Sequence, residues 1–249
     1  MADTRVKTKQ EIDDITTSGK MLAQVLNLVS NNVAPGITPI DLALLAKKEV
    51  KALGGVPTFL GMYGFPDVIC ISVNDEIVHG IPKNKEIKNG DIVSFDFGVT
   101  YNGMITDAAR SKIAGKGSPS AERLLKGTLE SLDSGISVIK NGVRVGDISN
   151  AVEKVLNRYG FGIVRELVGH GVGHELHEDP NIPNYGPAGK GPVLKSGMTI
   201  AIEPMTTLGS HDISTDADGW TIRTLDGSLA AHFEDTVLIT ENSYEILTR

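Results

Sequence analysis

Hydrophobic side chains recur at three- and four-residue steps in four stretches of this chain, which is the period of one face of an α-helix. The first two stretches cover 12–29 and 38–53, and the second begins with Pro39, which a helix tolerates in its first turn. The other two cover 118–136 and 145–159. The pattern therefore predicts two pairs of helices.

Shorter apolar segments between and after the helix pairs have the composition of β-strands. They cover 68–73, 92–100, 105–113, 199–205 and 236–239. Asn102–Gly103 lies between two of these segments and is typical of a type I′ hairpin turn. Helices in pairs and strands in hairpins predict an α+β fold rather than alternating β–α units.

The two halves of the chain resemble each other at a nearly constant offset. A shift of about 106 residues places the second predicted helix on the fourth, and within one residue the same shift places Asp96 on Glu203. No proline- or serine-rich linker separates the copies. The repeat predicts a single domain over 1–249, built from two pseudo-symmetric halves at about 10–115 and 116–249.

Composition limits the classes of protein to which the chain can belong. It has 249 residues, a formal net charge of −7 and a single cysteine, Cys70. An acidic chain is a poor candidate for nucleic-acid binding, and one cysteine favours a reducing compartment. No apolar run approaches the ~18 residues of a membrane helix, and the polar segment 1–14 lacks the apolar core of a signal peptide. We therefore expect a cytoplasmic protein with no nucleic-acid or membrane partner.

Two acidic residues lie in the predicted hairpin strands of the first half, and one of them, Asp96, lies inside a mostly apolar strand. If the hairpin pairs residue 101 with residue 104, Asp96 and Asp107 become diagonal neighbours on one face of the sheet. Carboxylates that converge on a semi-buried face either raise a pKa or hold a cation. For this pair alone, a structural interpretation in which a backbone donor or Arg110 satisfies Asp96 is equally good.

Two further acids lie in strands of the second half. Glu203 ends an apolar strand, and Glu234 leads into the last predicted strand. Each of them alone is more often a salt-bridged or exposed residue. Four acids in the strands of a duplicated sheet would balance two divalent cations, so a two-metal site outweighs the structural interpretation.

Three histidines, His170, His174 and His177, occur within eight residues and have glycines between them. The glycines argue against a metalloprotease helix, and the order His–Glu–Leu–His does not match the H-E-x-x-H zinc motif. A glycine-rich turn that brings the backbone close to a ligand fits better. A further histidine, His79, is expected in a loop.

Seven segments carry a specific combination of motifs: Asn74–Pro82, Asp96, Asp107, Gly169–Gly173, His177–Pro180, Ile202–Met205 and His232–Asp235. Together they resemble the type I methionine aminopeptidases, over nearly the whole chain from about Lys9. The resemblance implies the pita-bread fold, in which a curved antiparallel sheet and two helix pairs surround a dinuclear metal site.

The resemblance also implies the metal ligands, which are Asp96, Asp107, His170, Glu203 and Glu234. Asp107 and Glu234 would bridge two divalent cations, and His170 would supply the single nitrogen. This ligand set suits Co, Mn, Fe and Zn alike, so the identity of the metal stays open.

The resemblance further implies the residues that contact substrate. His79 and His177 would lie near the scissile amide, and the methionine pocket would be formed by Phe59, Met62, Phe65, Cys70, Leu176 and Trp220. Met62 and Leu176 replace aromatic residues that are common in the family. His174 also departs from some relatives, at the rim of the site.

The expected activity is removal of the N-terminal methionine from nascent proteins whose second residue is small. Glu203 is the candidate general base, with His177 as donor to the developing oxyanion and His79 as donor to the scissile nitrogen. We expect a monomer, and a transient contact with the ribosome stays open.

Two other interpretations are weighed against this one. An X-Pro aminopeptidase or prolidase of the same fold has a similar segment at 169–174, but it usually carries an extra N-terminal domain before the catalytic repeat, which begins here near residue 10. A non-catalytic binding relative would have lost ligands, whereas all five positions are acidic or histidine. The type II subclass would carry a long helical insertion in the second half, for which a chain of 249 residues leaves no room.

Overall fold

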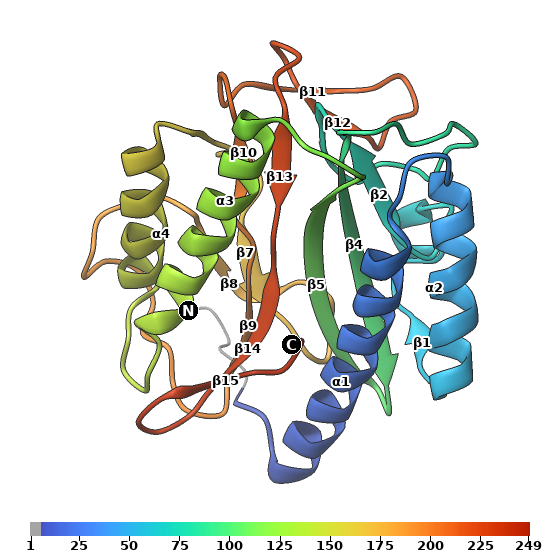
Figure 1. Ribbon diagram of the computed structural model, residues 1–249. Coiled ribbons are helices and arrows are strands. Elements are labelled where there is room, and N and C mark those ends of the chain that lie inside the picture. The colour runs from blue at the N-terminus through green and yellow to red at the C-terminus, as the bar shows by residue number, and fades with distance from the viewer. Residues whose placement is uncertain (1–5) are drawn as a thin grey trace.

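The computed structural model describes residues 6–249 and contains the four helices that the hydrophobic pattern predicts. They are α1 (Lys9–Asn32), α2 (Pro39–Leu53), α3 (Pro119–Ser137) and α4 (Val145–Tyr159). In Figure 1, α1 and α2 lie on one side of the molecule and α3 and α4 lie on the other, with strands between and behind them. The predicted α+β class is confirmed.

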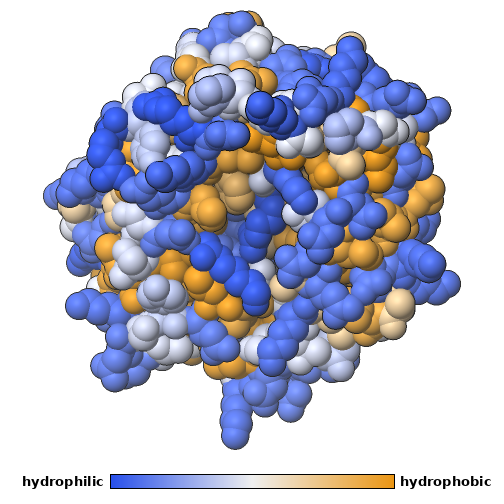
Figure 2. Space-filling view, viewed as in Figure 1, coloured by the Kyte–Doolittle hydropathy of each residue, from blue (hydrophilic) through white to orange (hydrophobic). Residues whose placement is uncertain are grey.

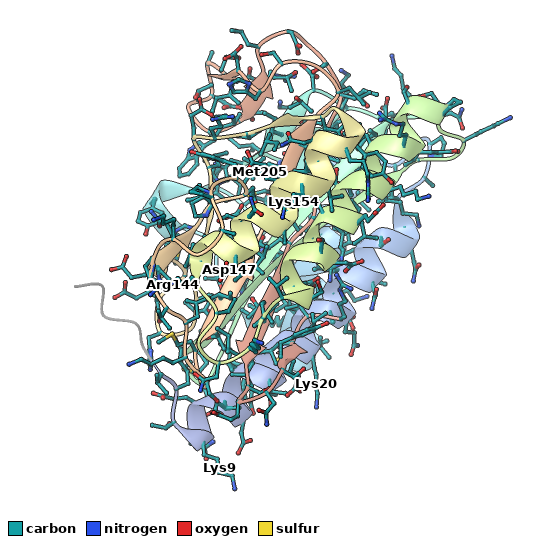
Figure 3. All side chains as sticks on the ribbon, turned by 90° about the vertical axis from the view of Figure 1, so that its left-hand side faces the viewer. Lys9, Lys20, Arg144, Asp147, Lys154 and Met205 are labelled. Atoms are coloured by element: carbon teal, nitrogen blue, oxygen red, sulfur yellow. The ribbon has the colours of Figure 1, made fainter. Side chains whose placement is uncertain are left out.

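Helices α2 and α4 begin and end in the same way. Before α2 the Thr38 N–H donates to the Asp41 carboxylate (3.0 Å), and before α4 the Arg144 N–H donates to the Asp147 carboxylate (3.1 Å). Figure 3 shows Arg144 and Asp147 near the same end of α4. Each helix ends at a glycine with left-handed backbone angles, which only glycine adopts without strain.

The repeat predicted from the sequence has a counterpart in these helices, because both bounds of α4 lie 106 residues after those of α2. This offset supports one domain made of halves at about 10–115 and 116–249, a division that stays a prediction. The predicted span of 1–249 also includes residues 1–5, which lie outside the described residues.

Fifteen short strands form four antiparallel sheets within residues 6–249. The strands are β1 (Val56–Pro57), β2 (Cys70–Val73), β3 (Glu76–Val78), β4 (Ile92–Tyr101), β5 (Met104–Ile113), β6 (Gly162–Ile163), β7 (Gly169–Gly171), β8 (Glu178–Ile182), β9 (Thr199–Ile202), β10 (Met205–Thr207), β11 (Ile213–Thr215), β12 (Ile222–Thr224), β13 (Ala230–His232), β14 (Asp235–Ile239) and β15 (Tyr244–Ile246). In the first sheet β4 pairs with β1, β2 and β5, and a second sheet has the order β15-β14-β9-β7-β8. The other two have the orders β13-β10-β6 and β11-β12-β3.

The β4–β5 hairpin has the predicted register. Tyr101 pairs with Met104 around a turn in which Asn102 and Gly103 both have positive φ, 48° and 82°. These angles are those of a type I′ turn, whose twist matches that of the flanking strands. Asp96 and Asp107 consequently point from one face of the sheet, as the pattern predicted.

Two predicted strands differ from the observed ones. The segment 68–73 forms a strand only over Cys70–Val73. The segment 199–205 is not one strand, because the chain leaves the β9 ladder at Glu203 and Pro204 and continues as β10 in another sheet. Proline lacks the N–H that would continue the ladder, so Glu203 lies where the chain changes sheets.

Side-chain hydroxyls and one backbone pair join the first sheet to strands of the second half. Ala109 of β5 and Glu234 exchange both of their backbone hydrogen bonds (3.3 and 3.0 Å). The Thr236 hydroxyl accepts from the Asp107 N–H (3.0 Å) and donates to the Asp107 carbonyl (2.7 Å). The Ser111 hydroxyl binds the backbone N–H and carbonyl of a β13 residue in the same manner. These contacts fix the two halves relative to each other.

Each helix pair covers its own hydrophobic core. Phe95 and Phe97 of β4 are fully buried beneath α1 and α2, and Ile200 of β9 is fully buried beneath α3 and α4. On the helix-bearing face, Figure 2 shows hydrophobic residues scattered among hydrophilic ones. Within residues 6–249, no helix has both the length and the apolar character required to cross a membrane.

The segment before α1 is anchored to the loop 174–178. The Lys7 ammonium donates to the Glu178 carboxylate (2.7 Å), and these two side chains are 1% and 5% exposed. The same carboxylate accepts the His174 N–H (2.6 Å), and the His174 ring lies 2.6 Å from the Glu11 carboxylate. Since the loop carries two of the predicted substrate-contact residues, the N-terminal segment helps to hold them in place.

Replacing Lys7 by methionine should lower the free energy of unfolding by about 3 kcal/mol, because Glu178 would then be a buried charge without its partner. Urea unfolding measures this change. Lys9→Met is the matched control, since Lys9 is exposed and its loss should change the stability by less than about 0.5 kcal/mol. Adding Glu178→Gln to Lys7→Met should recover part of the loss, and a purely additive double variant would contradict the prediction.

Candidate metal centre

Five side chains predicted as metal ligands converge on one buried space between the two main sheets, which are the sheet of β4 and the sheet β15-β14-β9-β7-β8. They are Asp96 on β4, Asp107 on β5, His170 on β7, Glu203 after β9 and Glu234 before β14. All five are buried, with exposures of 9% or less. The sequence separates these residues by up to 138 positions, and the sheets bring them together because each residue faces the gap between the halves.

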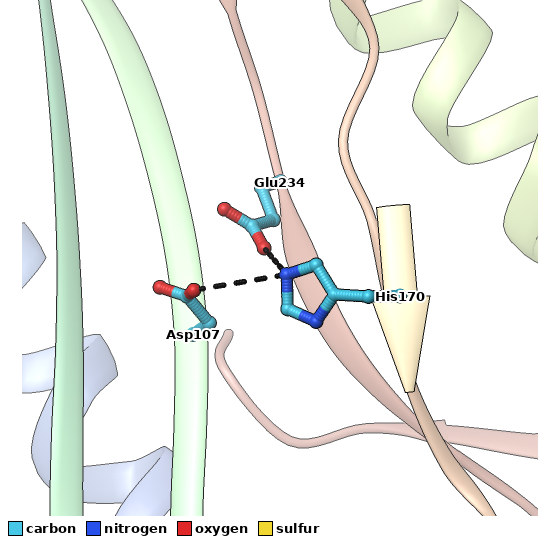
Figure 4. A group of neighbouring side chains, drawn as sticks. All are labelled: Asp107, His170 and Glu234. Atoms are coloured by element: carbon cyan, nitrogen blue, oxygen red, sulfur yellow. Dashed lines mark ion pairs between the residues drawn. The ribbon is translucent and has the colours of Figure 1, made fainter. Parts of the chain in front are cut away.

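The spacing around His170 fits a shared cation. Its Nε2 atom lies 4.0 Å from Asp107 Oδ2 and 4.0 Å from Glu234 Oε1, as Figure 4 shows, and 3.8 Å from Glu203 Oε1. These distances are too long for hydrogen bonds. Two ligand atoms that each lie ~2.1 Å from one ion are separated by roughly 3 to 4 Å. The donors are therefore spaced as ligands of a metal rather than as partners of one another.

The His170 ring is oriented by its other nitrogen. Nδ1 lies 2.9 Å from the Gly171 carbonyl, which assigns the proton to Nδ1 and leaves a lone pair on Nε2 toward the carboxylates. Burial lowers the pKa of His170 to about 3, so the ring is neutral at physiological pH. A neutral imidazole with its free nitrogen aimed at carboxylates is a metal ligand in its binding form.

The carboxylates are under strong electrostatic stress in the absence of a cation. Burial raises the pKa of Asp96 to about 7 and that of Glu203 to about 8. Burial and the neighbouring acids raise the pKa of Asp107 and of Glu234 well above the usual range. Among the described residues, Asp96 Oδ1, Asp107 Oδ1 and Glu234 Oε1 have no hydrogen-bond partner. A divalent cation would satisfy these atoms and offset the repulsion.

The backbone around the acids is held by contacts behind the site. Arg110 donates to the Glu234 carbonyl and to the Asp235 carboxylate (2.7 Å), which is fully buried. The Asn184 side chain donates to the Glu203 carbonyl (3.0 Å). These partners fix the directions of Glu203 and Glu234, as the supporting contacts of a metal site do.

One further buried imidazole at this centre was not predicted from the sequence. His232 Nε2 lies 3.5 Å from Glu203 Oε2 and 3.9 Å from Glu234 Oε2. Burial lowers the pKa of His232 to about 4. The sequence carried a signal, since His232 stands two positions before Glu234 and alternate residues of an extended chain share a face.

The predicted substrate residues line a single cavity beside the acids. Its volume is about 230 Å³, smaller than the roughly 300–1,000 Å³ of drug-sized ligand pockets, so it suits one side chain and nearby backbone atoms. Its wall includes every residue predicted for the pocket, namely Phe59, Met62, Phe65, Cys70, Leu176 and Trp220. The wall also includes Tyr63, Val78, Leu167, Val168 and Met205, which sequence reasoning missed. These five are ordinary loop or core residues in the sequence, and only the fold places them here.

The two predicted catalytic histidines face this cavity from different loops. His79 follows β3 with a positive φ of 59°, and burial lowers its pKa to about 4. His177 packs edge-on against His170 (4.5 Å between ring centroids) and parallel to Tyr63 (6.3 Å), and desolvation lowers its pKa. Both rings are therefore neutral hydrogen-bonding groups near pH 7.

Cys70 is a wall residue rather than a nucleophile. It is 4% exposed, and burial together with Asp96 and Asp107 raises the pKa of its thiol well above the usual value. A protonated thiol is a poor nucleophile and oxidises slowly. Its small, polarizable side chain leaves room between Phe65 and the acids.

The model of metallopeptidase family M24 matches residues 13–241. A methionine aminopeptidase of Clostridium perfringens is 46% identical over 98% of both chains. The crystal structure of a methionine aminopeptidase from Thermotoga maritima covers 100% of both chains, with a TM-score of 0.97 and 46% identity. A prolidase from Pyrococcus furiosus has a TM-score of 0.81 and 26% identity, over 99% of this chain and 66% of its own.

The stability of the metal-free protein should fall as the pH rises from about 7.5 to 8.5. In this window His170 and His232 are neutral in the folded protein and almost fully neutral in the unfolded chain, because unperturbed histidines titrate near a pKa of ~6.5. Asp96 and Glu203 hold protons in the folded protein with pKa values of about 7 and 8, and lose them on unfolding. Because the folded state binds more protons, the slope is on the order of 1 kcal/mol per pH unit for each proton held.

Thermal unfolding in a chelator, at pH values of about 7.5, 8 and 8.5, measures this slope. Saturating Mn²⁺ should remove it, since metal binding displaces the protons. Asp107→Asn should weaken the slope by removing one of the repelling charges. A metal-free protein that becomes more stable over the same range would contradict the prediction.

Proposed function

The chain belongs to metallopeptidase family M24 as a methionine aminopeptidase, and we propose that its activity depends on two divalent cations held between the two main sheets. The family membership confirms the resemblance seen in the sequence and the predicted pita-bread fold. A divalent metal requirement follows from the same membership and from the cluster of carboxylate and imidazole groups. The number of cations and the role of each residue are the content of the proposal.

One observation carries the proposal: buried carboxylate oxygens without partners surround a neutral imidazole whose free nitrogen faces them. The proposed ligands are Asp96, Asp107, His170, Glu203 and Glu234. Asp107 and Glu234 approach each other from the two sheets, which supports a bridging role for both. Oxygen-rich ligation with imidazole suits Mn, Fe, Co and Zn.

When bound, the cations would anchor the substrate's free α-amine, polarise the scissile carbonyl and make water a better nucleophile at neutral pH. Glu203 is the proposed general base. Its carboxylate lines the cavity. Burial alone raises its pKa to about 8, and bound cations would keep it ionised and able to accept a proton. The acceptor of the proton from the attacking water is therefore Glu203 Oε1 or Oε2.

His177 and His79 are the proposed hydrogen-bond donors to the reacting amide. Both are neutral near pH 7, so each offers one ring N–H without bringing a positive charge next to the cations. His177 would donate to the oxygen on which negative charge develops, and His79 to the scissile nitrogen. A donor placed where charge develops stabilises the transition state more than the ground state.

The apolar end of the cavity is the proposed methionine pocket. Phe65 and Trp220 meet edge to face with their ring centroids 5.2 Å apart, and Leu176 is buried beside them. An unbranched thioether side chain adapts to such a wall and gains from sulfur–aromatic contact. The limited volume supports a preference for a small second residue.

The proposal extends to a monomer that acts in the cytoplasm on newly made chains. Every residue of the candidate site comes from one chain, so a second copy is not needed to complete it. Nascent N-termini are the substrates of the activity, and a transient contact with the ribosome would bring them to the site.

Glu203→Gln should lower the release of methionine from a Met-Ala-Ser peptide by about 100- to 10,000-fold, the usual loss for a general base. Amino-acid analysis of Mn²⁺- or Co²⁺-loaded protein measures this release, and the metal content of the variant is determined in parallel. Glu241→Gln is the control, because Glu241 is exposed and is not among the residues that line the cavity. Full activity in Glu203→Gln would exclude the proposed base.

The same assay separates the alternative activities. Release of free methionine supports the proposal. Cleavage of X-Pro bonds in place of Met-Ala bonds would favour a prolidase-like enzyme. No cleavage with Mn²⁺, Fe²⁺, Co²⁺ or Zn²⁺ would leave a binding relative and overturn the roles of all five ligands.

Phe65→Leu should lower kcat/KM for the methionine peptide by about 10-fold or more, because one pocket contact is worth roughly 1–3 kcal/mol. The loss should be smaller for a peptide that begins with alanine, whose side chain does not reach Phe65. Leu60→Ala is the control, since Leu60 is a 50% exposed neighbour on the same segment. Equal losses for both peptides would indicate a general structural effect instead of a pocket.

A further inference from the structure

We propose that His232 is a second imidazole ligand of the metal centre, binding through Nε2 the cation that lies between Glu203 and Glu234. The inference rests on the proposed function and adds a residue that the resemblance did not supply, since the ligand set implied by the sequence contains a single nitrogen.

The spacing of the donor atoms is the first support. One ligand atom each from Glu203, His232 and Glu234 lie within 4.8 Å of one another, and a separate set of the same size is formed by Asp107, His170 and Glu234. His232 Nε2 is 3.5 Å from Glu203 Oε2 and 3.9 Å from Glu234 Oε2. Both distances fall in the roughly 3–4 Å range expected between two ligands of one ion.

The second support is a buried nitrogen without a partner. The His232 side chain is 1% exposed, and its Nε2 has no hydrogen-bond partner among residues 6–249. A buried polar atom in this state costs stability unless a water, an ion or a ligand satisfies it. The groups nearest to this nitrogen are carboxylates, and a cation shared with them would satisfy all of these groups together.

The backbone of His232 is rigid enough to aim the ring. Its N–H donates to the Ser111 hydroxyl (2.9 Å), which in turn donates to its carbonyl (2.8 Å), and β13 pairs it with Met205 of β10. The ring is therefore attached to a strand that is hydrogen-bonded along both of its edges. A ligand on a fixed strand loses little conformational entropy when the metal binds.

The inference changes the expected chemistry of the centre. Glu203 and Glu234 lie close to both His170 and His232, so the centre would have two imidazole donors instead of one. Nitrogen donors favour Fe, Co and Zn over Mn more than carboxylates alone do. His232 would thus bias the cation that it binds toward these metals.

The opposing possibility is that His232 only orients Glu203 and never touches the metal. Proton NMR of the protein loaded with two equivalents of Co²⁺ distinguishes the two cases. A histidine bound to Co²⁺ through Nε2 keeps an exchangeable Nδ1–H, whose signal is shifted far outside the normal range by the unpaired electrons. We expect two such signals in the unsubstituted protein, and one would overturn the proposal.

His232→Gln tests the assignment of the second signal. His211→Gln is the matched control, because His211 is 46% exposed and is not among the residues that line the cavity. The His232 variant should lose one of the two shifted signals. Calorimetric titration should show a Co²⁺ affinity at least about tenfold weaker for the second equivalent, with a smaller change for Mn²⁺. Unchanged signals and affinities in His232→Gln would also overturn the proposal.

Failure of this inference is distinguishable from failure of the proposed function. If two Co²⁺ ions bind and methionine is released, but only one shifted N–H signal is present, the two-metal aminopeptidase stands without His232 as a ligand. If no Co²⁺ binds, the proposed function fails as well. If His232→Gln does not fold, the number of signals in the unsubstituted protein still decides.

Discussion

The mutual repulsion of four buried carboxylates is the constraint on which the rest of this structure depends. Asp96, Asp107, Glu203 and Glu234 come from two sheets and meet where water is largely excluded, so their negative charge is poorly screened. Such an arrangement persists only because the scaffold holds it and because cations or protons compensate it. A divalent cation would offset this unfavourable charge, so the same feature that lowers the stability of the metal-free protein favours metal binding.

Hydrogen bonds next to the acids hold the first sheet against the strands of the second half. The Thr236 hydroxyl binds the backbone N–H and carbonyl of Asp107, and Ala109, two residues further along β5, exchanges backbone hydrogen bonds with Glu234. These contacts hold the backbone of Asp107 next to the second sheet. A hydroxyl can do this because it both donates and accepts hydrogen bonds. The centre is therefore prearranged rather than assembled by the metal.

The same packing separates the site into a charged end and an apolar end. Lys7 and Glu178 hold the loop that places Leu176 in the proposed methionine pocket and His177 beside His170, so one anchored loop contributes to both ends. Burial keeps the histidines neutral, which suits them as metal ligands and hydrogen-bond donors next to cations. Electrostatics and side-chain recognition thus depend on one set of contacts.

The sequence by itself determined the features that depend on near neighbours. The four helices, their ends at α2 and α4, and the hairpin register that makes Asp96 and Asp107 diagonal neighbours follow from local periodicity and turn chemistry. The motifs indicated the candidate site residues. Only the tertiary structure decided the rest: that the chain changes sheets at Glu203, that Tyr63 and Met205 reach the cavity, and that His232 stands beside the acids. The physical reason is that such contacts depend on which distant strands pair, and local propensity carries no information about the partner.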